Sequence, residues 1–121
     1  MKNRLVEILR NLNLSQDYDV IGQGELDTYD EIPLNYFTFS IWDNARSGFY
    51  DNKHTKNHVG IQIIAYSTDE TFVEEMSKRA VKELEKNDFI IQDDPTDYPT
   101  TNKDYTAQIV DNIYFIKNKE E

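Results

Sequence analysis

The chain has 121 residues, 38% of them hydrophobic, and its 23 acidic and 13 basic side chains give a formal net charge of −10. This length supports one domain over residues 1–121 with a substantial core. The absence of cysteine excludes disulfides, thiolate zinc sites and cysteine nucleophiles. The acidic balance argues against binding to a nucleic-acid backbone, which requires clustered Lys and Arg.

The first predicted element is an amphipathic helix over residues 2–11. Its apolar side chains, Leu5, Ile8, Leu9 and Leu12, follow the i, i+3, i+4, i+7 spacing of one helix face. A polar turn should follow, and then a short strand over 19–21. Six acids and no Lys or Arg lie between Asp17 and Glu31. This segment is either a solvated connection or a surface that repels DNA or meets a basic partner.

Residues 36–42 form the clearest predicted strand, since Phe37, Phe39 and Ile41 alternate with residues that point the other way. Residues 43–57 are predicted to be a long hairpin loop. Strand character returns over 58–66, where Val59, Ile61, Ile63 and Ala65 share a face.

A second amphipathic helix should begin at a capping box in which Ser67 and Glu70 bond to each other's backbone N–H groups. We expect it to close at Asn87 in the left-handed conformation. A short strand over 89–92, a loop over 93–104 and a last strand over 105–116 should follow. In that strand one face is predicted to carry Ala107, Ile109, Ile113 and Phe115. Alternatively, Asp111 and Asn112 form a turn between two shorter strands. Residues 116–121 are predicted to be a frayed end.

This order of elements predicts an α+β fold, with a mostly antiparallel sheet and two helices packed on one face. The second face of the strands also carries apolar and aromatic residues, among them Trp42, Tyr66 and Tyr114. Because large exposed apolar patches are uncommon on monomers, this face is a candidate for pairing with another copy.

Motifs for catalysis, cofactors and metals are weak. His54 and His58 have H-x-x-x-H spacing, but the segment does not look helical and the glutamate of a metalloprotease is missing, so surface histidines are favoured. Gly22-Gln23-Gly24 is only half of a dinucleotide fingerprint. No nucleophile motif accompanies a histidine and a carboxylate. We therefore expect no enzyme, no cofactor and no metal site.

In the combination of its motifs the chain resembles the tail-completion or tail-terminator proteins of long-tailed, non-contractile bacteriophages and of prophages of Gram-positive bacteria. The resemblance runs from Ile32 to Phe115, about two-thirds of the chain. Its carriers are Ile32-Pro33 with Tyr36-Phe37-Thr38-Phe39, Phe49-Tyr50-Asp51-Asn52, His58 to Ile63, Tyr66-Ser67-Thr68-Asp69, Leu84 to Phe89, and Tyr105 to Phe115. Asn87-Asp88 stands where the pattern leads us to expect a glycine.

The resemblance implies a structural virion protein of the phage tail, assembled in the cytoplasm of the bacterial host and not bound to a membrane. Its partners would be further copies in a ring, usually a hexamer, together with the tail tube protein and the head-completion or stopper protein. The ring would cap the tube, end its polymerisation and join tail to head, while DNA passes through the lumen. An acidic wall suits that passage because it repels phosphates.

The predicted interface residues are Trp42, Phe49, Tyr50, Asp51, Asn52 and Tyr66. By analogy, the segment over 43–57 contacts neighbouring subunits or the tube, and the plain alternative is a mobile loop. Two other function classes compete with this one. A small acidic inhibitor, such as a nucleic-acid mimic, would occupy a basic site on another protein. A hydrolase with an unrecognised site would need a perturbed carboxylate in a deep pocket.

Overall fold

The structure, a computed structural model, describes residues 2–22, 32–43 and 57–117. Within these ranges the chain forms two helices and six strands. They are α1 (Lys2–Arg10), β1 (Asp19–Gly22), β2 (Asn35–Asp43), β3 (Asn57–Ser67), α2 (Glu70–Lys86), β4 (Ile90–Ile91), β5 (Thr96–Asp97) and β6 (Thr106–Lys117). Residues 44–56, which include most of the predicted hairpin loop, lie outside the described residues.

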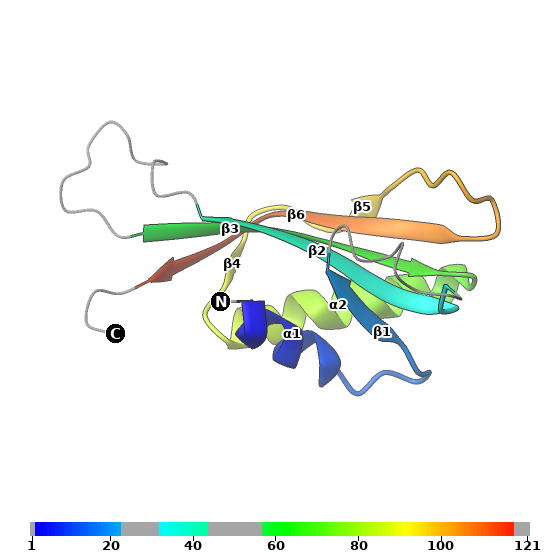
Figure 1. The fold of residues 1–121 in the computed structure, drawn as a ribbon, viewed down its shortest axis with the longest axis horizontal. Coiled ribbons are helices and arrows are strands. Elements are labelled where there is room, and N and C mark those ends of the chain that lie inside the picture. Colours follow the sequence, from blue (N-terminus) through cyan, green and yellow to red (C-terminus); the bar gives the residue numbers. More distant parts are fainter. Residues whose placement is uncertain (1, 23–31, 44–56, 118–121) are drawn as a thin grey trace.

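The six strands belong to one sheet with the order β1-β2-β3-β6-β4, and β5 also pairs with β6. β1 runs parallel to β2, whereas every other pair is antiparallel. Both helices lie against the same side of this sheet (Figure 1). The predicted α+β architecture is therefore confirmed. We call the side away from α1 and α2 the open face.

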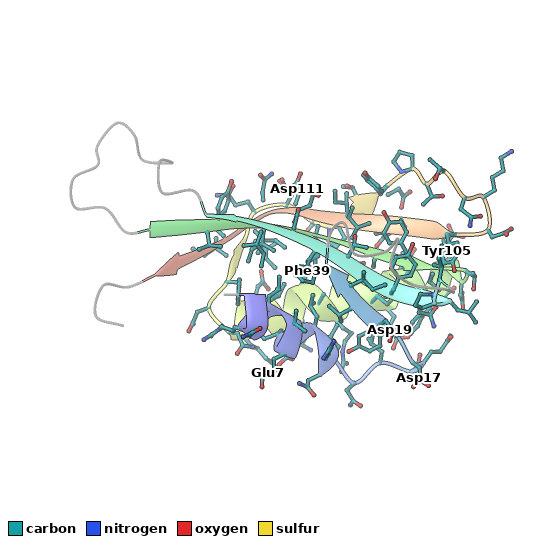
Figure 2. All side chains as sticks on the ribbon, viewed as in Figure 1. Glu7, Asp17, Asp19, Phe39, Tyr105 and Asp111 are labelled. Atoms are coloured by element: carbon teal, nitrogen blue, oxygen red, sulfur yellow. The ribbon has the colours of Figure 1, made fainter. Side chains whose placement is uncertain are left out.

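The core lies between the sheet and the helices, where the apolar stripes of both layers meet. Phe37 on β2, Ile61 on β3 and Leu84 on α2 have no exposed surface. Figure 2 shows Phe39 between the layers, while Asp111 lies on the open face and Glu7 on the outer side of α1. Burying each such apolar side chain stabilises the fold by about 1.5–3 kcal/mol, so the alternating pattern of β2 and β3 decides which face the helices cover.

Two side chains of α2 form hydrogen bonds to the segment between α1 and β1. Glu75 accepts hydrogen bonds from the N–H and the Oγ of Ser15, at 3.0 and 2.9 Å. One turn later, Arg79 donates to the carbonyl oxygen of Leu12 at 3.1 Å. The hydroxyl of Tyr18 donates to the carbonyl oxygen of Leu9, which lies in the last turn of α1 and has no helical partner of its own. These contacts hold α1 and α2 together at the start of β1.

The predicted capping box of α2 is wrong by two residues. The N-cap is Asp69, whose carboxylate accepts from the N–H of Thr71 at 3.0 Å. Ser67 is still in β3, where it pairs with Asn35 of β2. Its hydroxyl accepts from the N–H of Asp69 and therefore stabilises the turn into α2 but does not cap the helix.

The end of α2 is also displaced from the prediction, by one residue. Asp88, with φ of 73°, takes the left-handed conformation expected for Asn87. The N–H of Asp88 bonds to the carbonyl oxygen of Glu85, and the N–H of Phe89 bonds to that of Leu84. This is the Schellman pattern, and it places the buried Phe89 beside the end of the helix.

The last strand, predicted over 105–116, is confirmed as the continuous β6, so the alternative of a turn at Asp111 and Asn112 is excluded. These two residues instead form a β-bulge opposite Gln62, and Asn112 has a φ of 54°. The extra residue reverses the side-chain alternation. As a result Val110 joins Ile113 in the core, whereas Ala107 and Ile109 lie on the open face, opposite Tyr66 and Ile64 of β3. The predicted common face of Ala107, Ile109, Ile113 and Phe115 is thus wrong.

Two further differences concern the edge of the sheet beside β6. The strand expected over 89–92 is reduced to β4, and the loop expected over 93–104 contains β5, which pairs with Ile109 and Gln108. The prediction of a frayed end over 116–121 is wrong for its first two residues, since β6 extends to Lys117, and residues 118–121 lie outside the described residues. Neither of the described helices is long and apolar enough to cross a membrane.

Candidate interaction surface

The structure reaches only part of the predicted interface. Phe49, Tyr50, Asp51 and Asn52 lie outside the described residues, so their assignment stays a prediction. Trp42 lies in β2, opposite Gly60 of β3, but its side chain is likewise not described. Tyr66, the remaining member, is half-buried on the open face near the end of β3.

Tyr66 belongs to a group of four tyrosines at one end of the open face. Its ring stacks on that of Tyr36 in β2, with the ring centroids 4.7 Å apart and an interplanar angle of 12°. Tyr105, just before β6, meets Tyr36 edge-on at 5.9 Å. The fourth, Tyr98, follows β5 and is 37% exposed. Cross-strand aromatic pairs of this kind stabilise a sheet by roughly 0.2–1 kcal/mol each.

These tyrosines line a cavity of about 300 Å³, which we call the tyrosine pocket. Its wall is completed by Ile32, Pro99, Thr100, Thr101 and Asn102. The segment between β5 and β6 that supplies Tyr98 to Asn102 arches over this end of the sheet (Figure 1). The pocket is therefore built from three stretches of chain that lie far apart in the sequence.

Hydrogen bonds fix two of the four tyrosine hydroxyls. The Tyr105 hydroxyl donates to the carbonyl oxygen of Pro33 at 2.7 Å and so ties the start of β6 to the residues before β2. Tyr66 is hydrogen-bonded to the side chain of Thr38. The Tyr36 hydroxyl has no hydrogen-bond partner among the described residues, although this side chain is only 5% exposed.

The phenols of Tyr36, Tyr66 and Tyr105 are neutral at physiological pH, because the pKa of each is raised above its ordinary value. Burial, reinforced by repulsion from the phenols of Tyr66 and Tyr105, raises the pKa of Tyr36 from 10.0 to about 12. Burial is also the main cause that raises the pKa of Tyr66 and the pKa of Tyr105. For Tyr105, repulsion from the carboxylate of Asp104 is a second, smaller cause. The pocket therefore presents aromatic rings and neutral hydroxyls to a ligand.

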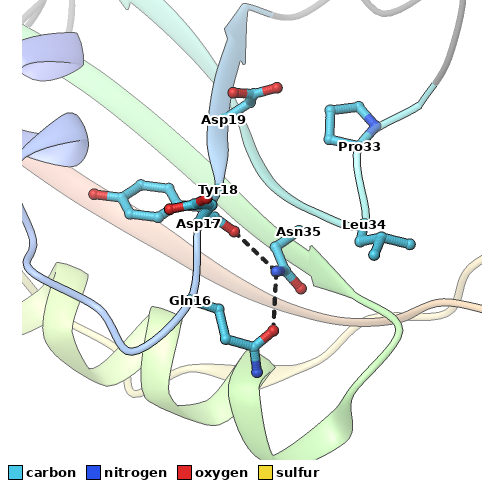
Figure 3. Close-up of a pocket in the computed structure, with 7 residues that line it drawn as sticks. All are labelled: Gln16, Asp17, Tyr18, Asp19, Pro33, Leu34 and Asn35. Carbon is cyan, nitrogen blue, oxygen red and sulfur yellow. Dashed lines mark hydrogen bonds between the residues drawn. The ribbon is translucent and has the colours of Figure 1, made fainter.

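A second cavity, of about 340 Å³, lies between the start of β1 and the residues before β2 (Figure 3). At its base Asn35 donates through Nδ2 to the carbonyl oxygen of Asp17 at 2.9 Å and to Oε1 of Gln16 at 3.3 Å. Its Oδ1 accepts from the hydroxyl of Ser67 at 2.5 Å. Both N–H donors of the Asn35 side chain are thus bonded within the protein. Asn35 therefore joins β2 to β3 and to the residues before β1, and its side chain has a structural role.

Beside Asn35, the rim of this cavity carries an exposed apolar side chain. Leu34 is 67% exposed, and Ile32, on the other side of Pro33, is 46% exposed. The exposed carboxylates of Asp17 and Asp19 flank the same rim. Leu34 is thus an exposed apolar side chain with two carboxylates beside it.

The described residues contain no cluster of side chains suited to bind a metal ion. Within the described ranges no three His, Cys, Asp or Glu side chains come together to bind a metal ion. His54 lies outside the described residues, and the side chain of His58 is not described. The hypothesis of a metal site on these histidines therefore stays untested.

Sequence reasoning missed most of the tyrosine pocket. It selected Tyr66 from the strand pattern but not Tyr98 or Tyr105. No short-range pattern marks Tyr98 and Tyr105 as members of the pocket, because the strand order brings them to Tyr36 and Tyr66. No model of a known protein family matches this chain, and a search of curated proteins finds no significant match.

Proposed function

We propose that the protein is a structural subunit that assembles into a ring, as the resemblance to phage tail terminators implies. In this role it would cap the tail tube, end tube polymerisation and join the tail to the head. The support is the sequence resemblance together with an α+β fold in which both described helices lie on the same side of the sheet.

One structural observation carries the proposal: exposed apolar side chains occur at both edges of the sheet. Leu34 lies beside β1, and Ile90, which is 45% exposed, lies on β4 at the opposite edge. A ring of identical subunits needs two different surfaces on each subunit, because one side of a copy meets the other side of the next. The two edges supply such a pair of surfaces.

Charge is consistent with the same role. The net charge of −10 disfavours adhesion to a phosphate backbone, so DNA could pass through a ring of these subunits without being held. The proposal predicts no catalytic activity and no cofactor.

Light scattering across a concentration series, with electron microscopy of the purified protein alone and mixed with tail tubes, tests the proposal. We expect a ring in solution or capture at one end of the tubes. Leu34→Ser and Ile90→Ser should each weaken assembly about tenfold, as the loss of a central apolar contact does. Glu85→Ser, on the exposed side of α2, is the matched control and should assemble normally.

A protein that stays monomeric at every concentration and ignores the tubes would contradict the proposal. In that case a monomer that binds a basic protein would favour the acidic inhibitor instead. Pull-down with a positively charged DNA-binding protein, in the presence and absence of competing DNA, separates these outcomes.

A further inference from the structure

We propose that the tyrosine pocket binds the guanidinium group of an arginine side chain presented by a partner protein. The inference goes beyond the proposed ring, since the pocket lies within one subunit and does not depend on assembly. It rests on the shape of the pocket, on one hydroxyl that has no hydrogen-bond partner among the described residues, and on the distribution of charge.

The size and lining of the pocket suit a side chain of this kind. A volume of about 300 Å³ lies at the lower end of the range for ligand sites and is large enough for one long side chain. Tyr66 is half-buried and Tyr98 is 37% exposed, so part of each ring is accessible from solvent. Aromatic rings attract cations through their negative faces, and arginine is the commonest partner because its flat group stacks on them.

The Tyr36 hydroxyl supplies the polar contact that orients the ligand. This side chain is 95% buried, lines the pocket and has no hydrogen-bond partner among the described residues. Buried polar groups are nearly always paired in folded proteins, so a water molecule or a ligand is a fitting partner for a hydroxyl to which no described residue bonds. A guanidinium group is all donor, and the phenol oxygen can accept one of its hydrogen bonds.

The surrounding charge favours a cation over an anion. None of the described residues that line the pocket is charged. Asp104, at the end of the segment that forms one wall, repels the phenolate of Tyr105 and raises its pKa, and the chain as a whole carries a net charge of −10. A positive side chain therefore approaches through a negative field, and the described part of the pocket wall holds no cation to repel it.

The test uses the full-length protein with ¹³C-labelled tyrosine rings and the peptide Ac-Gly-Gly-Arg-Gly-Gly-NH2, followed by NMR. We expect saturable shifts of the Tyr66 and Tyr98 ring signals. Tyr18, which lies on the helix side of the sheet and bonds to α1, is the internal control and should not shift. The same peptide with citrulline keeps the shape but loses the charge, and it should bind at least about tenfold more weakly.

Three variants locate the contact. Tyr98→Leu should weaken binding about threefold to fivefold, whereas Tyr98→Phe, which keeps the ring, should change it less than about twofold. Tyr36→Phe removes one oxygen and should weaken binding about tenfold. Thermal unfolding of each variant verifies that the fold is retained.

Equal binding of the citrulline peptide, unchanged tyrosine signals at saturating peptide, or unchanged affinity of Tyr36→Phe would each overturn the proposal. Because the experiment measures peptide binding to a pocket within one subunit, its failure leaves the ring proposal intact. Conversely, a monomeric protein that binds the arginine peptide would refute the ring and retain the pocket.

Discussion

Replacing Ser67 by alanine should be one of the most destabilising single-atom changes in this protein. The Ser67 side chain has no exposed surface, and its hydroxyl both donates to Oδ1 of Asn35 and accepts from the N–H of Asp69. Asn35 in turn holds the segment before β1 through the carbonyl oxygen of Asp17. One hydroxyl therefore joins β2, β3, the start of α2 and the approach to β1.

The magnitude follows from the bonds that disappear. Each lost hydrogen bond costs about 1 kcal/mol, and the buried Asn35 oxygen, left without its partner, adds about 1 kcal/mol or more. We therefore expect Ser67→Ala to lower the free energy of unfolding by about 3 kcal/mol. For a domain of this size the melting temperature should fall by about 10 °C.

Urea unfolding followed by circular dichroism measures this loss. Thr68→Ala, at the exposed neighbouring position, is the matched control and should change stability by less than about 0.5 kcal/mol. A double-mutant cycle with Asn35→Ala should give a coupling energy of about 1 kcal/mol or more. If Ser67→Ala behaves like Thr68→Ala, or if the two losses simply add, the reasoning about this buried junction is refuted.

Three further predictions concern the helix end, the core and the tyrosines. Asp88→Gly should stabilise the protein by about 0.5–1 kcal/mol in urea unfolding, since glycine accepts positive φ without strain; Asn87→Gly, at φ of −103°, should instead destabilise it. Leu84→Ala should cost about 2–5 kcal/mol by the same assay, and a loss below about 1 kcal/mol would show that Leu84 is not enclosed as described. The raised pKa of Tyr36, about 12 against 10.0 in the unfolded chain, contributes stability that is complete below pH 10 and is lost as the pH rises toward 12. Unfolding in urea should therefore become easier over this interval, and Tyr36→Phe should reduce the dependence; an unchanged pH profile in that variant would contradict the assignment.

Local pattern was sufficient for the main elements. The alternation in β2 and the first part of β3 predicted both strands and their buried faces, because consecutive side chains of a strand point to opposite sides. The stripe of α2 likewise predicted a helix whose buried residues include Val73, Met76 and Leu84. These periodicities depend on residues close in sequence.

Details at element boundaries needed the folded structure. Ser67 and Glu70 have the spacing of a capping box. However, Ser67 pairs with Asn35 and so belongs to the sheet, and the N-cap of α2 is Asp69. A left-handed residue was expected at the end of α2, yet the buried position of Phe89 placed that conformation on Asp88. Tertiary packing chose between neighbouring residues with similar local preferences.

The sequence by itself determined the α+β class, the apolar faces of β2 and β3, the two amphipathic helices and the acidic character of the chain. Only the tertiary structure decided which side of β6 is buried, because a single extra residue in the bulge at Asn112 reverses the alternation beyond it. It alone also brought together Tyr36, Tyr66, Tyr98 and Tyr105. Such a pocket depends on strand order and on contacts between residues as distant as Tyr105 and Pro33, and no short-range pattern encodes those.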